Sequence, residues 1–201
     1  DALLVVRPGG ALPEEERRLT LEVMTALQDG DLHAALHEVQ RLVRLYTGAE
    51  AVGVRLADGD DFPYFESSGF PAQFLQAERS VCAQGPDGRV LRDPAGVPVL
   101  ECMCGRVLRG QTSPSADCFT PHGSFFSNRT SRLVASTRER ERPAHARNRC
   151  TLEGYESVGL FPLRSGVQTF GLLQVADHRP DRFTGEGLVL LERLADVLGQ
   201  A

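Results

Sequence analysis

Gly159-Leu160-Phe161-Pro162-Leu163-Arg164 and Gly171-Leu172-Leu173-Gln174-Val175-Ala176 are two short apolar segments separated by a turn sequence that contains serine and glycine. Apolar runs of this length on either side of a glycine-containing turn are typical of a β-hairpin. We therefore predict strands over residues 157–164 and 167–176, paired at the centre of a sheet. After them, Thr184 is placed to cap a final helix in which leucines recur on one side.

The first part of the chain predicts two amphipathic helices and then a strand. Apolar residues spaced three and four apart form one helical face over residues 19–27 and another over residues 32–46. Asp31 is a suitable N-cap for the second helix, and Gly48 is a suitable end. Residues 52–56 then alternate between apolar and other side chains, as in a half-buried strand.

The middle of the chain is less regular. A second strand is expected over residues 62–67, whereas residues 82–150 contain many turn signals and all five cysteines. A long irregular segment within a compact domain is usually functional or disordered, and the cysteines favour a function. The order of elements predicts an α+β fold: a central antiparallel sheet, helices packed on one face and a long cysteine-bearing insert.

Several segments together resemble the GAF domain family. They are the two hairpin strands, Phe183-Thr184-Gly185-Glu186 before the last helix, and Leu42 to Gly48 followed by Ala49-Glu50-Ala51-Val52-Gly53-Val54. The resemblance covers roughly residues 31–200 and implies a sensory module that binds a small ligand or cofactor in a bacterial signalling protein. GAF domains often dimerise through their terminal helices. We accordingly expect an N-terminal helical linker over residues 1–30 and a GAF-like sensory domain over residues 31–201.

The cysteines are the main chemical signal of the insert. Cys102-Met103-Cys104-Gly105 brings two thiols close together, and two distant cysteines would complete a tetrahedral zinc site or hold an iron–sulfur cluster. Zinc is preferred, because cluster motifs usually contain a longer compact run of cysteines. Cys118 could replace Cys82 without changing the argument; reduced, packed thiols and a reversible disulfide remain alternatives. The preferred ligands are Cys82, Cys102, Cys104 and Cys150.

Arginines and aromatic residues in and after the insert suggest a binding pocket. Seven arginines occur between residues 129 and 149, and Arg147 and Arg149 are the best candidates to hold an anionic group through forked hydrogen bonds. Phe125 and Tyr155 are candidates to line the pocket, although such residues more often belong to the core. The interleaved glutamates favour a solvated face for the other arginines.

Composition narrows the class of protein. The net charge of −5 and the few aromatic residues argue against nucleic-acid binding. The sequence contains no run of about 18 apolar residues, so no membrane span is expected. All 22 basic residues are arginine, so Schiff-base lysine chemistry is excluded. An odd number of cysteines without a secretory signal predicts a cytoplasmic location.

These observations predict a non-catalytic sensory domain of a bacterial signal-transduction protein. A cysteine-rich metal or redox site would be coupled to a small ligand, and the partners would be an attached output domain and a second copy of the chain. The alternative is an enzyme, since some GAF proteins reduce free methionine sulfoxide with cysteines; Cys102, Cys104 or Cys118 would then supply the reacting thiols. A pure dimerisation module is a third possibility.

Overall fold

A five-stranded antiparallel sheet forms the centre of the molecule. The computed structural model describes residues 14–28, 30–114, 116–136 and 147–201. The strand order is β2-β1-β5-β4-β3, and every neighbouring pair is antiparallel. This confirms the predicted hairpin of β4 and β5 at the centre of the sheet, where β5 is the middle strand. The strands are β1 (Ala51–Leu56), β2 (Tyr64–Ser68), β3 (Phe125–Ser127), β4 (Ser157–Ser165) and β5 (Gln168–Asp177).

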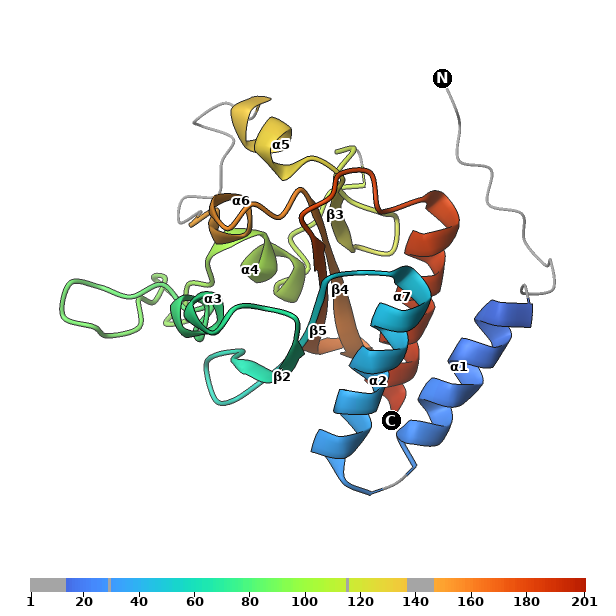
Figure 1. Ribbon diagram of the computed structural model, residues 1–201. Helices are drawn as coiled ribbons and strands as arrows, with labels where there is room; N and C mark the ends of the chain where they lie inside the picture. The colour runs from blue at the N-terminus through green and yellow to red at the C-terminus, as the bar shows by residue number, and fades with distance from the viewer. Residues whose placement is uncertain (1–13, 29, 115, 137–146) are drawn as a thin grey trace.

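Three long helices lie on one side of the sheet: two of them pack against the strands, and the first packs against those two helices (Figure 1). Asp31 caps the second of these helices by accepting hydrogen bonds from the backbone N–H groups of His33 and Ala34, and Gly48 ends it with φ 64°. Thr184 caps the last helix through the N–H of Gly187. The predicted caps are therefore confirmed. The helices are α1 (Glu14–Ala26), α2 (Leu32–Thr47) and α7 (Gly185–Gln200).

Short helices and loops cover the opposite face, so the sheet is buried on both sides. A second apolar cluster forms there around Phe70, Phe125, Leu160 and Leu172. Consequently β1 is buried along most of its length, whereas its alternating sequence predicted a half-buried strand. The short helices are α3 (Ala72–Ala77), α4 (Cys102–Leu108), α5 (Thr130–Ser136) and α6 (Arg149–Leu152).

The segment between α3 and α4 extends away from the sheet as a loop with short ladders (Figure 1). Isolated antiparallel bridges join Cys82 to Leu100, Gln84 to Val90 and Arg92 to Pro98. The Cys82–Leu100 bridge closes this excursion just before α4 begins. The excursion therefore returns the chain to the sheet at the first cysteine of the Cys-x-Cys pair.

The first helix shares its core with the rest of the domain. Leu19 and Val23 of α1 are fully buried in the cluster that also contains residues of α2 and α7. The part of the expected linker over residues 1–13 lies outside the described residues, and the boundary at residue 31 stays a prediction. No helix in the described part of the chain is long and apolar enough to cross a membrane.

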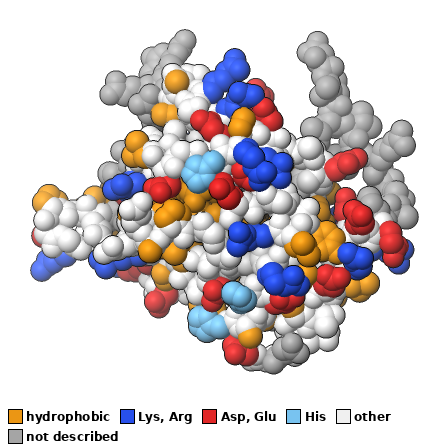
Figure 2. Space-filling model, viewed as in Figure 1, with side chains coloured by type: hydrophobic (Ala, Val, Ile, Leu, Met, Phe, Trp, Pro, Cys, Tyr) orange, Lys and Arg blue, Asp and Glu red, His pale blue; other side chains and the backbone are white. Residues whose placement is uncertain are grey.

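Surface charge is mixed rather than concentrated. Figure 2 shows basic and acidic side chains interspersed over the visible face. Many of them form pairs, such as Arg41 with Glu38 at 2.7 Å and Arg129 with Asp181 at 2.5 Å. Since exposed pairs of this kind contribute little to stability, they mainly keep the surface polar.

Candidate functional site

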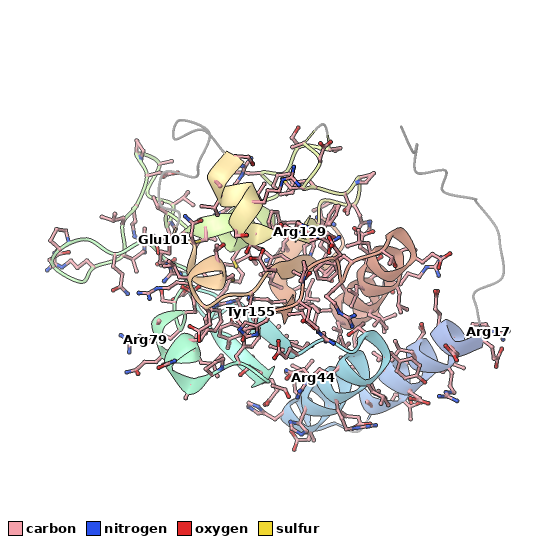
Figure 3. All side chains as sticks on the ribbon, turned by 45° about the horizontal axis from the view of Figure 1, so that its top comes forward. Arg17, Arg44, Arg79, Glu101, Arg129 and Tyr155 are labelled. Carbon is pink, nitrogen blue, oxygen red and sulfur yellow. The ribbon has the colours of Figure 1, made fainter. Side chains whose placement is uncertain are left out.

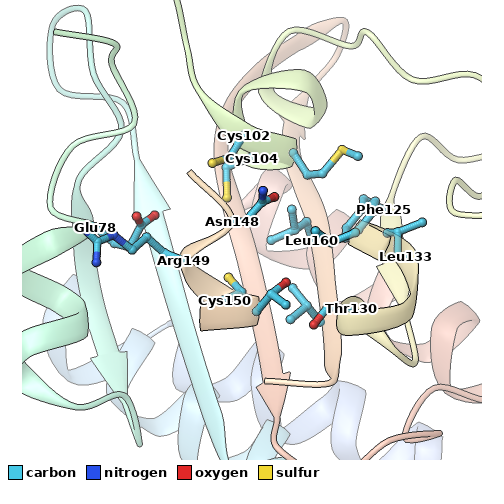
Figure 4. Close-up of a pocket in the computed structure, with 14 residues that line it drawn as sticks. Glu78, Cys102, Cys104, Phe125, Thr130, Leu133, Asn148, Arg149, Cys150 and Leu160 are labelled. Atoms are coloured by element: carbon cyan, nitrogen blue, oxygen red, sulfur yellow. The ribbon is translucent and has the colours of Figure 1, made fainter. Parts of the chain in front are cut away.

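A small cavity lies between the second face of the sheet and helices α4, α5 and α6 (Figure 4). Its volume is about 90 Å³, which is small beside the roughly 300–1,000 Å³ of pockets for drug-sized ligands. Its walls are mainly apolar, with a few polar groups. The lining residues from strands and helices are Phe125, Val158 and Leu160; Cys102, Met103 and Cys104; Thr130, Leu133 and Val134; and Arg149, Cys150 and Thr151. Glu78 and Asn148 complete the lining.

Three of the four predicted metal ligands meet at this cavity. Cys102 and Cys104 reach it from α4, and Cys150 reaches it from α6. The backbone N–H of Arg147 donates to Cys102 Sγ at 2.9 Å, and the side-chain amide of Gln174 donates to Cys150 Sγ at 3.6 Å. Residues about fifty positions apart in sequence meet because α4 and α6 both line this cavity.

Burial keeps these thiols protonated. Burial raises the pKa of Cys104 to about 12 and raises the pKa of Cys150 well above its usual value. Burial also raises the pKa of Cys102, although the N–H groups of Arg147 and Asn148 oppose that rise. At neutral pH the cavity therefore presents soft, neutral thiols. These are weak nucleophiles and weak metal ligands, because the thiolate is the reactive form.

Cys82, the fourth predicted ligand, lies elsewhere. Its Sγ donates to the backbone carbonyl of Asp60 at 3.3 Å, and burial raises its pKa to about 11. Cys118 is part-buried and does not line the cavity either. Among the described residues no group of three or more Cys, His, Asp or Glu side chains is placed to hold a metal ion. The donors therefore do not form a ready-made site for zinc or for an iron–sulfur cluster, and zinc stays a prediction.

Gly105 has a packing role within the cysteine motif. A Cβ atom at this position would lie 2.7 Å from the backbone carbonyl carbon of Leu100, which is closer than real Cβ contacts allow. The absence of a side chain at Gly105 therefore has a structural reason. The structure shows that it lets α4 approach the preceding strand-like segment, which positions Cys102 and Cys104 over the sheet.

A network of buried charges lies beside the thiols. Arg55 is fully buried, and its guanidinium donates to the backbone carbonyls of Phe62 at 2.9 Å and Glu78 at 2.7 Å. Its centre lies 3.7 Å from the ring centroid of Tyr64. Glu78 Oε2 lies 3.8 Å from Arg55 and 3.5 Å from Arg147. The network therefore joins β1, β2 and the end of α3 at the edge of the cavity.

The structure divides the four predicted ligand-binding residues into two groups. Phe125 and Arg149 line the cavity. Arg147 instead forms an ion pair with Glu101 at 2.8 Å and donates to the carbonyl of Ser80 at 2.8 Å. Tyr155 is only 1% exposed and packs in the interior (Figure 3), against Phe70 and Phe74.

Three arginines of the cluster lie outside the described residues: Arg138, Arg140 and Arg142. Glu78 is the charged cavity residue that sequence reasoning missed, along with the polar residues Thr130, Asn148 and Thr151. It follows a short helix, and no motif or spacing marks it. Arg55 points to such a partner only once its burial is known, because a buried charge requires one.

The insert also contacts the last helix. Thr120 Oγ1 donates to Glu192 Oε1 at 2.5 Å, and His122 Nε2 lies 3.0 Å from Asp196 Oδ1. The backbone carbonyl of His122 accepts a hydrogen bond from Arg164 of β4 at 2.8 Å. The loop that carries these residues leads directly into β3, whose Phe125 lines the cavity.

The fold and the cavity define a class of α+β domain in which a central antiparallel sheet holds a small pocket under a covering segment. The chain belongs to the GAF domain family, whose model matches residues 31–201. None of the curated proteins compared with the chain matches it significantly.

Solved structures share this fold at low sequence identity. A GAF domain from a phosphoenolpyruvate-protein phosphotransferase of Coxiella burnetii is 12% identical, with a TM-score of 0.61 and coverage of 92% of this chain and 90% of that one. Free methionine-R-sulfoxide reductase from Neisseria meningitidis, in complex with its substrate, is 15% identical, with a TM-score of 0.58 and coverage of 94% and 90%. A domain assigned to a two-component sensor histidine kinase of Sinorhizobium meliloti is 12% identical, with a TM-score of 0.53 and coverage of 85% and 90%. At these identities the likeness concerns the fold.

Proposed function

We propose that this chain is a non-catalytic sensory domain of a bacterial signalling protein and that it binds a small molecule in the cavity between α4, α5, α6 and the sheet. The observation that carries the proposal is the cavity itself. It is concave, mainly apolar and provided with a few polar groups, which are the usual features of a small-molecule site. Its volume of about 90 Å³ suits a metabolite rather than a nucleotide.

The state of the thiols supports binding rather than catalysis. A catalytic cysteine needs a lowered pKa, a neighbouring base or a metal. In the cavity, burial raises the pKa values of all three thiols instead. The thiols then contribute polarizable contact surface. Because oxidation follows thiolate character and exposure, the redox role predicted from the sequence would require a conformation that exposes them.

Contacts between the insert and α7 support an effect on an attached output domain. Thr120 and His122 contact Glu192 and Asp196 on α7. A ligand that moves Phe125 would shift the adjoining loop and, through these contacts, the last helix. Such a signal requires two conformations that bind the ligand with different affinity.

The proposal includes two further expectations. The first is a homodimer through the terminal helices, supported by Leu21 and Met24, which are 61% and 46% exposed on α1. The second is a cytoplasmic location, where thiols of this kind stay reduced.

A cavity-filling variant tests the site. Val134 lines the cavity from α5, whereas the adjacent Ala135 is exposed and does not line it. Val134→Trp should abolish binding of any cavity ligand, and Ala135→Trp should leave binding unchanged. We would measure thermal stabilisation by a panel of amino acids, short carboxylic acids, short alcohols and nucleosides. If no probe stabilises the wild-type domain in a manner that depends on Val134, the proposed function is wrong.

Two assays separate the other possibilities. The first assay measures turnover of free methionine sulfoxide with a thiol reductant. Turnover that is lost on Cys102→Ser would show that the domain is an enzyme and not a non-catalytic sensor; we expect no turnover. Metal analysis tests zinc: one zinc per chain, lost on Cys82→Ser, would require Cys82 to leave the Asp60 carbonyl and join the other thiols.

A further inference from the structure

The cavity has a polar end and an apolar end. Figure 4 shows Glu78 and Arg149 on one side of the cavity and Phe125, Leu133 and Leu160 on the other. The labelled cysteines lie between these two sides. A ligand that fits this arrangement carries its polar groups together at one end of a short apolar body.

Glu78 supplies an acceptor at the polar end. Its residue is 5% exposed, and its Oε2 atom faces Arg55 and Arg147, whereas Oε1 is buried and has no hydrogen-bond partner. A buried carboxylate oxygen without a partner is costly, so such atoms usually have a partner when the protein is in its working state. Oε1 has almost no accessible surface, so a ligand donor in the cavity would become that partner through a small movement of the Glu78 side chain.

Arg149 supplies a donor at the same end. Its side chain lines the cavity and is exposed at the mouth. Figure 4 shows Arg149 and Glu78 on the same side of the cavity, and the charge of Arg149, with those of Arg147 and Arg55, opposes the rise that burial causes in the pKa of Glu78. No ion pair within 4.0 Å joins Arg149 to any acidic group in the described part of the chain. Its planar fork is therefore open to a carboxylate.

We propose that the ligand is a small α-amino acid with an apolar side chain, held by its ammonium group at Glu78 Oε1 and by its carboxylate at Arg149, with the side chain towards Phe125 and Leu160. This inference rests on the proposed function, because it assigns a ligand class to the same cavity. Three arginines, Arg55, Arg147 and Arg149, and two glutamates, Glu78 and Glu101, lie at this end, so the ligand carboxylate would meet the excess positive charge. A zwitterionic ligand would pair with both Glu78 Oε1 and the Arg149 guanidinium without adding net charge to the cavity.

The test compares L-leucine with three analogues that each lack one feature. They are 4-methylpentanoic acid, which lacks the ammonium; 3-methylbutylamine, which lacks the carboxylate; and 2-hydroxy-4-methylpentanoic acid, which keeps a neutral donor. Calorimetric titration of the wild-type domain should show binding of leucine at least about tenfold tighter than of the acid or the amine, because each lost charge-assisted hydrogen bond weakens binding by that factor or more. The hydroxy acid should bind with intermediate affinity.

Variants assign the two contacts. Arg149→Gln should weaken leucine binding by about tenfold or more and leave binding of 3-methylbutylamine unchanged, since the amine has no carboxylate. Arg132→Gln, an exposed change on α5 outside the cavity lining, is the matched control and should alter neither. Glu78→Gln should weaken leucine and the amine alike, with urea unfolding used to verify that the variant is folded.

Different failures point to different causes. If leucine binds and Val134→Trp abolishes this binding while Arg149→Gln does not weaken it, the contact assignment is overturned and the cavity function stands. If short acids or alcohols bind in a Val134-dependent manner and no amino acid does, the ligand class is wrong and the function stands. If nothing binds in that manner, both proposals fail.

Discussion

Replacement of the buried Arg55 by methionine should strongly destabilise the domain. The side chain is 0% exposed, and its guanidinium donates two hydrogen bonds to the carbonyls of Phe62 and Glu78 and lies over the Tyr64 ring. Arg55→Met keeps an apolar stem of similar length but leaves two buried carbonyls unpaired. It also leaves the Glu78 carboxylate with Arg147 as its remaining close cation in the network.

The expected loss follows from these contacts. Hydrogen bonds to charged groups contribute about 1.5–3 kcal/mol each, and a desolvated cation–π contact contributes about 2 kcal/mol. The gross loss is therefore about 5–8 kcal/mol. The variant no longer has to dehydrate a guanidinium, which returns several kcal/mol. A net decrease of about 3 kcal/mol in the free energy of unfolding remains, close to the 3–5 kcal/mol found when one partner of a buried pair is removed.

Urea unfolding followed by circular dichroism measures this decrease. The exposed arginine of α2, Arg41, provides a matched control, and Arg41→Met should leave the unfolding midpoint unchanged. If Arg55→Met fails to fold, the milder Arg55→Lys, which keeps the charge but loses the fork, should still unfold at lower urea than the wild type. A decrease below about 1 kcal/mol for Arg55→Met would refute the reasoning, since it would mean that apolar packing replaces the network without loss.

Two further predictions concern the cysteine motif. Because burial raises the pKa of Cys104 to about 12 and of Cys82 to about 11, alkylation of the native protein by iodoacetamide, followed by mass spectrometry, should stay slow at pH 8. Rapid alkylation of Cys104 at pH 8 would contradict the burial argument. Because the folded state favours the neutral thiols, their contribution to the free energy of unfolding is complete below the unfolded pKa near 9 and is lost as the pH rises towards 11–12. Gly105→Ala should destabilise the domain by about 1–3 kcal/mol through overpacking against Leu100 and lower the melting temperature. An unchanged melting temperature would show that the Leu100 backbone gives way without cost.

The elements that follow local rules could be predicted from the sequence. Asp31, Gly48 and Thr184 mark helix ends through side-chain and backbone chemistry within four residues, so no tertiary information was needed. The hairpin of β4 and β5 is likewise a local unit, and its predicted limits agree with the structure to within a residue.

The covering of the second face could not be predicted in the same way. Residues 51, 53 and 55 of β1 face it, and an alternating strand with an arginine there indicates a solvated side. The face is buried because the insert folds back over it, and that depends on contacts between residues far apart in sequence. Arg55 is buried for this reason, and its partner Glu78 lies 23 positions away with no motif to mark it.

The candidate site shows the same division. Cys102 and Cys104 are obvious from their spacing, and Phe125 and Arg149 were predicted to bind a ligand; all four line the cavity. Tyr155 carried the same sequence signal as Phe125, yet it packs in the interior, because an aromatic residue in an irregular segment does not reveal which way it points. Cysteine count alone likewise could not show that the side chain of Cys82 bonds to the Asp60 carbonyl instead of joining the cavity.

The packing of α1 has a practical consequence for work on this protein. The family match begins at residue 31, but Leu19 and Val23 are 0% exposed between α2 and α7. A chain trimmed at residue 31 would lose these two side chains and uncover a continuous apolar strip along both remaining helices. Such a strip promotes self-association. A dimer observed with the trimmed chain would therefore arise from the newly exposed apolar surface and would say nothing about the native assembly. Oligomer measurements should therefore retain residues 14–30.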